Sequence, residues 1–299
     1  MEINWLKDFL TIAEERSFSR AAERRAITQS AFSRRIRALE EWVGVPLLDR
    51  STHKVQLTPS GERFRPAVVE ALQQLSTGRE DALGAASGAL RSLHFAATHA
   101  LAMTFFPTWL RGMEALAPLG ATIQLTADNM VACERLMIER RVHFLICHCH
   151  PAVSWKLGPG GFHSVRLGED VMLPVAAPQI TAGGPCARKD VLAYSQESGM
   201  GRILASVRVT EGEASCKPVF SSHLASALVT MARDGRGVAW VPRSLVVTDL
   251  AGGRLVLAGA PEDTVEIEIR LFRPRARLPA AAESFWERIK GQMSSDGQH

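Results

Sequence analysis

The chain has 299 residues, which at roughly 150 residues per domain suggests two domains. Hydrophobic residues make up 46% and charged residues 22% of the chain, a globular composition that excludes a largely disordered protein. No stretch approaches the roughly 20 consecutive apolar residues of a membrane span. The first ten residues also lack the basic start and apolar run of a signal peptide, so we expect a cytoplasmic protein with no membrane partner.

The net charge is only +4, but the basic residues are concentrated in one segment. Residues 20–37 contain six arginines and a single acidic residue, Glu23. Such a local surplus of positive charge is typical of a surface that docks on phosphates. A solvated, arginine-rich helix face would give the same pattern, so the charge alone leaves both interpretations open.

The first sixty residues predict a winged helix-turn-helix. Apolar residues at helical spacing predict a helix over 4–15, and a short second helix follows to about residue 25. Thr28 is a good N-cap for a third helix that would end before Gly44. Two extended runs, 47–50 and 54–57, would form the wing. In this arrangement the helix after the turn enters the major groove of DNA.

Polar and basic side chains occupy the front of the third predicted helix and the predicted wing. Glutamine can form paired hydrogen bonds with adenine, arginine with guanine, and serine can bond either base. Cations on a wing are suited to phosphates, which position the protein without specifying sequence. The candidate DNA-binding residues are Gln29, Ser30, Ser33, Arg34, Arg37, Arg50 and Lys54.

This region resembles the LysR-type transcriptional regulators. The matching segments, in family order and spacing, are Phe18–Ala22, Thr28–Ser33, Gly44–Arg50 and Leu57–Gly61. The resemblance implies a winged helix-turn-helix, a long linker helix and a C-terminal effector domain. By position, it puts Gln29, Ser30, Ser33 and Arg34 at bases or adjacent phosphates, and Arg50 at a phosphate. Many members have proline in place of Ser30, but proline is favoured rather than required early in a helix.

A long helix is predicted from Pro59 to about Gly84, with Thr58 as its N-cap. At 1.5 Å per residue it would be about 40 Å long. Its apolar stripe consists of Phe64, Val68, Leu72 and Leu75. We expect this helix to pair with a second copy, and Pro66 to bend it; packing on its own domain is the alternative. A dimer, or a dimer of dimers, would present reading helices to an inverted repeat.

From residue 91 onward strands and helices alternate, which predicts an α/β fold with a parallel sheet. The expected strands are 92–97, 122–126, 142–147, 165–175, 191–194, 238–241 and 266–273, and the expected helices are 100–116, 130–140, 199–205, 222–234 and 280–293. The expected domains are 1–58 (winged helix-turn-helix), 59–88 (linker) and 89–299 (effector domain), with lobe I about 89–164 and 265–299 and lobe II about 165–264. The LysR resemblance implies the same two-lobed, periplasmic-binding-protein-like architecture.

Ligands of open parallel sheets bind beyond the carboxyl ends of the strands, which places an effector cleft between the lobes. The candidate effector-binding residues are Thr98, His99, Ala100, Asn129, His148, Cys149, Ser198, Gly199, Met200, Ser222, His223 and Pro242. The helix expected after Ser198, and another after Ser222, could hold an anion on their first amides. For Thr98 and Ser222, helix capping alone is an equal alternative.

The run Cys147-His148-Cys149-His150 has the composition of a metal site. On a strand, however, the cysteines and the histidines face opposite sides, so each side offers two ligands rather than four. A buried structural strand is the favoured interpretation, and a thiol or metal sensor is the alternative. The five cysteines are too few and too irregular for a disulfide framework. We expect neither a metal nor a cofactor.

Met200 lies at the mouth of the predicted cleft. Several blocks resemble a LysR subgroup that responds to hypochlorite: residues 5–10, 31–40, 194–195, 200–204 and 285–286. The resemblance implies methionine oxidation as a signal, which would make a flexible apolar side chain polar. The alternative is that Met200 only packs at the cleft and that a small molecule is the effector.

Enzyme motifs are missing from the sequence. There is no Gly-x-Ser-x-Gly, no phosphate-binding glycine loop with lysine and no His-Glu-x-x-His, so we do not expect an enzyme. We predict a LysR-type DNA-binding regulator that controls promoters in response to a small-molecule effector or an oxidant sensed by the C-terminal domain. The alternative is a solute-binding or metal- or thiol-sensing module with an appended DNA-binding domain.

Overall fold

The computed structural model of the protein describes residues 1–50, 55–87, 91–181, 190–207, 218–260 and 263–296. The chain divides into two compact units, Met1–Gly88 and Ala89–His299. The tip of the predicted wing, including the candidate Lys54, lies outside the described residues, as do Cys186 and Cys216. No helix of the described chain is both long and apolar enough to cross a membrane.

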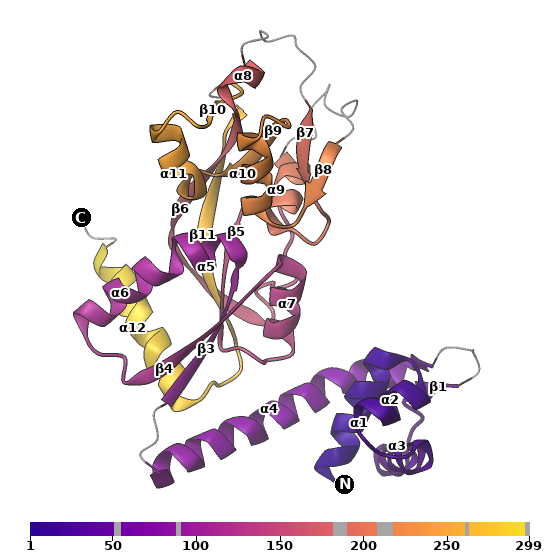
Figure 1. The fold of residues 1–299 in the computed structure, drawn as a ribbon. Coiled ribbons are helices and arrows are strands. Elements are labelled where there is room, and N and C mark those ends of the chain that lie inside the picture. Colours follow the sequence, from indigo (N-terminus) through magenta and orange to yellow (C-terminus); the bar gives the residue numbers. More distant parts are fainter. Residues whose placement is uncertain (51–54, 88–90, 182–189, 208–217, 261–262, 297–299) are drawn as a thin grey trace. The chain divides into compact units, whose positions relative to one another are not determined.

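The first unit consists of helices around a small core and a two-stranded ribbon (Figure 1). Its elements are α1 (Ile3–Glu15), α2 (Phe18–Arg24), α3 (Gln29–Val43), β1 (Leu48–Asp49), β2 (Gln56–Leu57) and α4 (Pro59–Ser87). Helix α3 begins where the Thr28 hydroxyl accepts a hydrogen bond from the amide of Ala31, and it ends at Gly44, whose φ is 84°. Strands β1 and β2 are antiparallel, which gives the short wing that the sequence predicts.

The core of the first unit fixes the position of α3. Phe9 of α1 and Phe32 and Ile36 of α3 are completely buried against one another. Asp8 is also fully buried, and it binds Arg25 at 2.6 Å and Arg35 at 3.4 Å. A buried carboxylate needs such partners, so these two arginines hold α1, α2 and α3 together.

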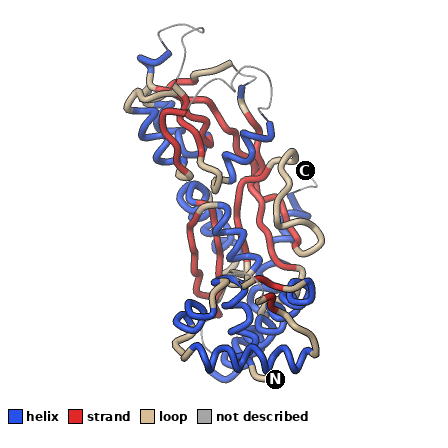
Figure 2. The backbone as a smooth tube through the Cα atoms, turned by 90° about the vertical axis from the view of Figure 1, so that its right-hand side faces the viewer, coloured by secondary structure: helices blue, strands red, loops and turns tan. Residues whose placement is uncertain are grey.

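The second unit is a mixed α/β domain. Its helices are α5 (His99–Thr104), α6 (Phe106–Leu116), α7 (Met130–Ile138), α8 (Pro178–Thr181), α9 (Gly199–Val207), α10 (Ala225–Arg233), α11 (Arg243–Ala251) and α12 (Ala280–Asp296). Its strands are β3 (Arg91–Thr98), β4 (Ala121–Asp128), β5 (Phe144–Cys149), β6 (Phe162–Ala176), β7 (Val191–Tyr194), β8 (Pro218–Ser222), β9 (Val238–Pro242), β10 (Val256–Leu257) and β11 (Val265–Pro274). They form one sheet in the order β4-β3-β5-β11-β6-β9-β7-β8, with β10 beside β6. Helices cover both faces of this sheet (Figure 2).

Two long antiparallel strands, β6 and β11, run through both lobes of this unit (Figure 1). The first lobe packs β3 and β5 against α6 and α12 around Phe95, Phe144 and Phe285. The second lobe packs β6, β7, β9 and α10 around Leu192 and Val241. The sheet is therefore mixed rather than parallel, because the connections through β6 and β11 reverse the strand direction.

The helix expected over residues 222–234 is wrong at its start. Residues Pro218–Ser222 form strand β8, which pairs with β7, and α10 begins only at Ala225. Phe220 is drawn into the core of the second lobe, and the Ser222 hydroxyl accepts from the amide of Leu224 at the turn. The short elements α8, α11 and β10 were not predicted, because they depend on packing against β6 and its neighbours rather than on a long periodic pattern.

Candidate functional site

The exposed side of α3 carries most of the candidate DNA-binding residues. Gln29, Ser30, Arg34 and Arg37 are exposed, and Ser33 is half-buried. Because the opposite side of α3 is anchored in the core by Phe32, this polar side is left facing solvent. The geometry is that of a recognition helix in a helix-turn-helix.

The structure sorts the arginines of the basic segment into two groups. Besides Arg25 and Arg35, Arg24 binds Glu14 at 2.7 Å and Arg20 lies 3.8 Å from Glu15. Those four arginines have acidic partners within the unit. Arg34 and Arg37 form no ion pair with any described residue, so they are the positive charges that α3 offers to an outside anion.

Arg50 has a structural partner that the sequence did not reveal. Its guanidinium binds the Glu40 carboxylate at 2.8 Å and lies over the Phe18 ring. Glu40 also accepts from the amides of Leu47 and Leu48, so this group ties the wing to α3. Arg50 remains exposed at its edge, with 38% of its side chain accessible, and is therefore still able to meet a phosphate.

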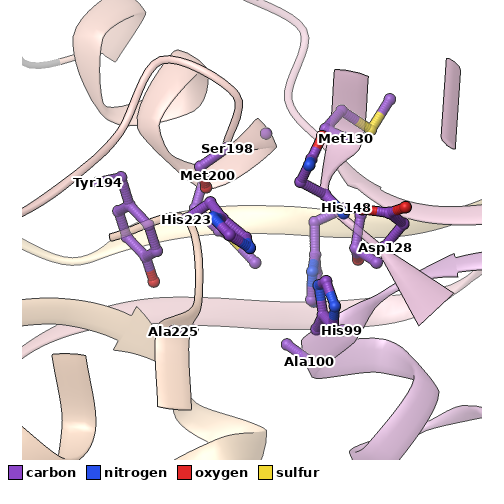
Figure 3. A pocket seen from close by; sticks show the side chains of 13 residues that line it. His99, Ala100, Asp128, Met130, His148, Tyr194, Ser198, Met200, His223 and Ala225 are labelled. Carbon is purple, nitrogen blue, oxygen red and sulfur yellow. Dashed lines mark hydrogen bonds between the residues drawn. The ribbon is translucent and has the colours of Figure 1, made fainter. Parts of the chain in front are cut away.

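A small cavity lies between the two lobes of the second unit (Figure 3). It holds about 30 Å³ of water-accessible space, close to one water molecule's share of liquid volume. Its lining contains these candidates: Thr98, His99, Ala100, Asn129, His148, Ser198, Gly199, Met200 and His223. Sequence reasoning missed four further lining residues: Asp128, Met130, Tyr194 and Ala225. The candidates Cys149, Ser222 and Pro242 do not line it.

Helices from both lobes begin at this cavity. Asn129 precedes α7 and caps it by accepting from the amide of Ala132. Ser198 precedes α9, and its hydroxyl accepts from the amide of Gly201 at 3.4 Å. Ala225 is the first residue of α10. The first turns of three helices therefore direct their partial positive charge toward one space.

Several buried polar atoms on the cavity wall have no hydrogen-bond partner among the described residues. They are Thr98 Oγ1, Tyr194 OH and Nδ1 of His148, whose Nε2 lies 3.5 Å from the Asp170 carboxylate. Thr98 precedes α5 but does not cap it, so capping does not explain this hydroxyl. Burial raises the pKa of Tyr194, which keeps its hydroxyl protonated as a donor. Unpartnered buried polar groups are uncommon in folded proteins, and these groups line the same cavity.

Two histidines of the cavity, His99 and His148, have lowered pKa values that favour the neutral form. His148 is 3% exposed, and burial lowers its pKa against the opposing effect of Asp170, 3.5 Å away. Burial is also the main cause that lowers the pKa of His99, whose ring centroid lies 5.7 Å from that of His223. A neutral imidazole offers one N–H donor and one acceptor.

Two methionines line the same cavity. Met130 is 1% exposed and Met200 is 7% exposed, and they come from α7 and α9 of opposite lobes (Figure 3). A methyl group added to Gly199 would lie 3.3 Å from the side chain of Met130, so the start of α9 packs closely on that methionine. A polar atom added to the Met130 sulfur would fall beside this contact, whereas Met200 packs among Met172 and Ile203.

The cysteine pair of β5 faces away from the cavity. Cys147 and Cys149 are buried with their sulfurs 3.7 Å apart, beside Cys133 of α7. The hydrogen bond from Cys149, together with burial, raises the pKa of Cys147, and burial raises the pKa of Cys133 to about 12. Neutral, buried thiols are poor nucleophiles. Within the described ranges, no group of three or more His, Cys, Asp or Glu residues is arranged to hold a metal.

A winged helix-turn-helix unit followed by a two-lobed α/β unit is the architecture of a class of DNA-binding transcriptional regulators. The family model described as "Bacterial regulatory helix-turn-helix protein, lysR family" matches residues 3–62. The model described as "LysR substrate binding domain" matches residues 86–294. The chain belongs to the LysR family and is a DNA-binding transcriptional regulator.

Individual relatives resemble the whole chain. It is 30% identical over 296 residues to the transcriptional regulator YjiE of Escherichia coli K12, covering 97% of this chain and 94% of YjiE. The full-length structure of HypT from Salmonella typhimurium, a hypochlorite-specific LysR-type regulator, is 32% identical, with a TM-score of 0.58 over 98% of this chain and 99% of HypT. DarR of Vibrio fischeri, solved in complex with DNA, is 29% identical, with a TM-score of 0.53 over 96% and 97% of the two chains.

Proposed function

We propose that this regulator binds a small anion in the cavity between its lobes, and that occupancy changes its affinity for promoter DNA. The observation that carries the proposal is the pair of unpartnered buried hydroxyls of Thr98 and Tyr194, which line this cavity from the two lobes. A compact anion can accept hydrogen bonds from these donors and from the amides of the three helix starts.

The size and charge of the cavity favour a small, singly charged occupant. The space is close to that of one water molecule. Asp128 adds a carboxylate to the wall, which disfavours ligands with several negative charges. The HypT regulatory domain, which is 26% identical with a TM-score of 0.55 over 69% of this chain and 97% of that domain, was solved with a bound bromide ion. That bromide supports a monovalent anion as the ligand here.

DNA binding is assigned to the exposed side of α3 in two copies of the chain. Gln29, Ser30, Ser33 and Arg34 would meet base edges or adjacent phosphates, and Arg37 and Arg50 phosphates. Arg34→Ala should lower affinity for the protein's own upstream DNA at fixed salt while the melting temperature is unchanged. Retained affinity would reject this role.

The anion proposal is tested with bromide, titrated against gluconate at constant ionic strength. Binding is followed by calorimetry and DNA affinity by fluorescence anisotropy. Thr98→Val and Tyr194→Phe each remove one hydroxyl and should weaken bromide about three- to tenfold, the range for a single hydrogen bond. Thr230→Val removes an exposed hydroxyl of α10 and is the matched control. Unchanged bromide affinity in both cavity variants would overturn the proposal.

Oxidant sensing by Met200 is a second candidate, favoured by the position of this sulfur on the cavity wall. Hypochlorite would transfer its oxygen to the thioether, releasing chloride and leaving a sulfoxide. The polar group would then lie among the apolar neighbours of Met200 on β6 and β11 and displace the first turn of α9. Similarity to hypochlorite-specific HypT, which was also solved as a methionine-to-glutamine variant, supports this candidate.

Substitution of Met200 separates the two candidates. Met200→Gln introduces a polar group and should shift DNA affinity without oxidant. Met103→Gln changes a methionine that is 68% exposed and should leave DNA affinity as it is. Met200→Leu should abolish the response of DNA affinity to limited hypochlorite. A Met200→Leu protein that still responds would exclude this sulfur as the sensor.

A further inference from the structure

A second, larger cavity lies in the first lobe and shares no lining residue with the effector cavity. Its volume is about 690 Å³, within the usual 300–1,000 Å³ of small-molecule sites. One wall consists of side chains from β11 and from the start of β6. The other wall is the segment 150–159 that follows β5.

The lining of this cavity combines an apolar, aromatic surface with positive charge. Trp155, Phe162 and Phe272 supply three aromatic side chains. Arg270 and Arg275 supply two guanidinium groups, while Glu268 supplies the one carboxylate among the described lining residues. An aromatic surface beside an arginine suits a flat ring that carries an anionic group.

The two arginines differ in how firmly they are engaged. Arg270 donates to Glu268 at 2.7 Å and to the Ser164 hydroxyl at 3.0 Å, so its charge is largely compensated. Arg275 donates from Nε to the carbonyl of Pro159 at 2.7 Å, which orients its guanidinium. Its terminal nitrogens have no acceptor among the described residues, so its two-pronged edge is available for a carboxylate.

Other polar groups of the lining do not oppose an anion there. His163 is neutral near pH 7, because burial and the nearby Arg275 lower its pKa. Trp155 has a buried indole Nε1 with no hydrogen-bond partner among the described residues. An indole N–H can only donate, so its missing partner is an acceptor such as a ligand oxygen.

We propose that this cavity is a second ligand site, specific for an aromatic carboxylate whose rings lie against Trp155, Phe162 and Phe272 and whose carboxylate binds Arg275. The aromatic contacts supply most of the buried apolar area, and the paired hydrogen bonds to Arg275 supply orientation.

Trp155 connects this site with the contact between the lobes. The guanidinium of Arg202 lies 5.9 Å from the centroid of the Trp155 ring, and it also binds Glu134 of α7. Arg202 is two residues beyond Met200 on α9. A ligand that repositions Trp155 therefore acts on the same helix that lines the effector cavity.

The test uses the full chain and 2-naphthoate as the probe, with 2-naphthylmethanol as the neutral analogue of the same shape. Calorimetry should show saturable binding of 2-naphthoate and at least tenfold weaker binding of the alcohol. Arg275→Gln should weaken 2-naphthoate at least tenfold, as expected for loss of a charge-assisted pair. Arg236→Gln, an exposed arginine that lines neither cavity, should leave its affinity within twofold.

Further outcomes separate this site from the effector cavity. His223→Ala alters the effector cavity and should leave 2-naphthoate binding unchanged. The proposal is overturned if 2-naphthoate does not bind, if the alcohol binds equally well, or if Arg275→Gln has no effect. Loss of binding in His223→Ala, with retention in Arg275→Gln, would assign the probe to the effector cavity instead. Because the bromide experiment uses different residues, the two proposals fail independently.

Discussion

The ion pair between Glu134 and Arg202 gives a quantitative test of how the lobes are held together. Glu134 lies on α7 of the first lobe and is 1% exposed. Both of its oxygens are within hydrogen-bond distance of Arg202 Nη1 on α9, at 2.9 and 3.0 Å. Arg202 is 24% exposed, so water reaches one side of the pair. Arg202→Met removes the cation and leaves a buried carboxylate without its partner.

The expected cost follows from this burial. Breaking a buried ion pair by removing one partner costs about 3–5 kcal/mol, because the remaining charge stays desolvated. Partial access of water to Arg202 places the expected loss near the lower end, about 3 kcal/mol. Replacing both partners removes the stranded charge, so the double variant Glu134→Leu with Arg202→Met should recover most of that loss.

Urea unfolding of the full chain, followed by tryptophan fluorescence and circular dichroism, measures these differences. The matched control is Arg135→Met on α7, the helix that carries Glu134. Arg135 pairs with Glu139 at 4.0 Å, and its side chain is 67% exposed. That variant should change the free energy of unfolding by less than about 1 kcal/mol. The reasoning is refuted if Arg202→Met is no more destabilising than the control, or if the double variant is as unstable as Arg202→Met.

Three further substitutions test local features of the two units. Thr28→Ala removes the hydroxyl that accepts from the amide of Ala31 and should lower the free energy of unfolding of the first unit by about 1 kcal/mol, as measured in urea. An unchanged free energy of unfolding would show that this cap does not stabilise α3. Gly61→Ala would place a methyl group 2.2 Å from the carbonyl oxygen of Leu47 and should lower the melting temperature, which an unchanged melt would contradict. Burial lowers the pKa of His143 to about 4, so the folded state binds fewer protons below pH 6.5 and loses up to about 3 kcal/mol by pH 4. His143→Asn should flatten that pH dependence, and a persisting slope would assign it to another group.

The first unit was largely predictable because its signals are local. The cap at Thr28, the left-handed Gly44 and the apolar spacing of α3 are encoded within a few residues of the elements they define. The roles of individual arginines were not predictable in this way. Arg25 and Arg35 bind Asp8, which lies 17 and 27 residues away, so only the tertiary fold distinguishes them from Arg34.

Most of the lining of the cavity between the lobes was predicted from the ends of strands. Tyr194 ends β7, and the same rule applied to that strand would have found it. Asp128 and Met130 flank the predicted Asn129, so the neighbouring positions were the missing signal. Ala225 could not be found, because its place depends on the exact start of α10, which the sequence put three residues too early.

Alternation along β5 explains why His148, and neither of its cysteine neighbours, faces the cavity between the lobes. Successive side chains of a strand point to opposite faces, so His148 faces the cavity while Cys147 and Cys149 pack beside α7. Sequence spacing gave this division but not its consequence: the histidine face meets α9 of the other lobe, and the thiol face stays within its own lobe.

Helix α9 links the features that bear on regulation. Its first turn carries Met200 at the cavity between the lobes, and two residues further along the helix Arg202 binds Glu134 and contacts Trp155. A rigid helix of nine residues cannot move one of these contacts without the others. An anion that draws the first turn of α9 inward, an oxygen atom added to Met200 and a ligand beside Trp155 would therefore all act on one equilibrium between two arrangements of the lobes. Their effects on DNA affinity should for this reason be coupled rather than independent.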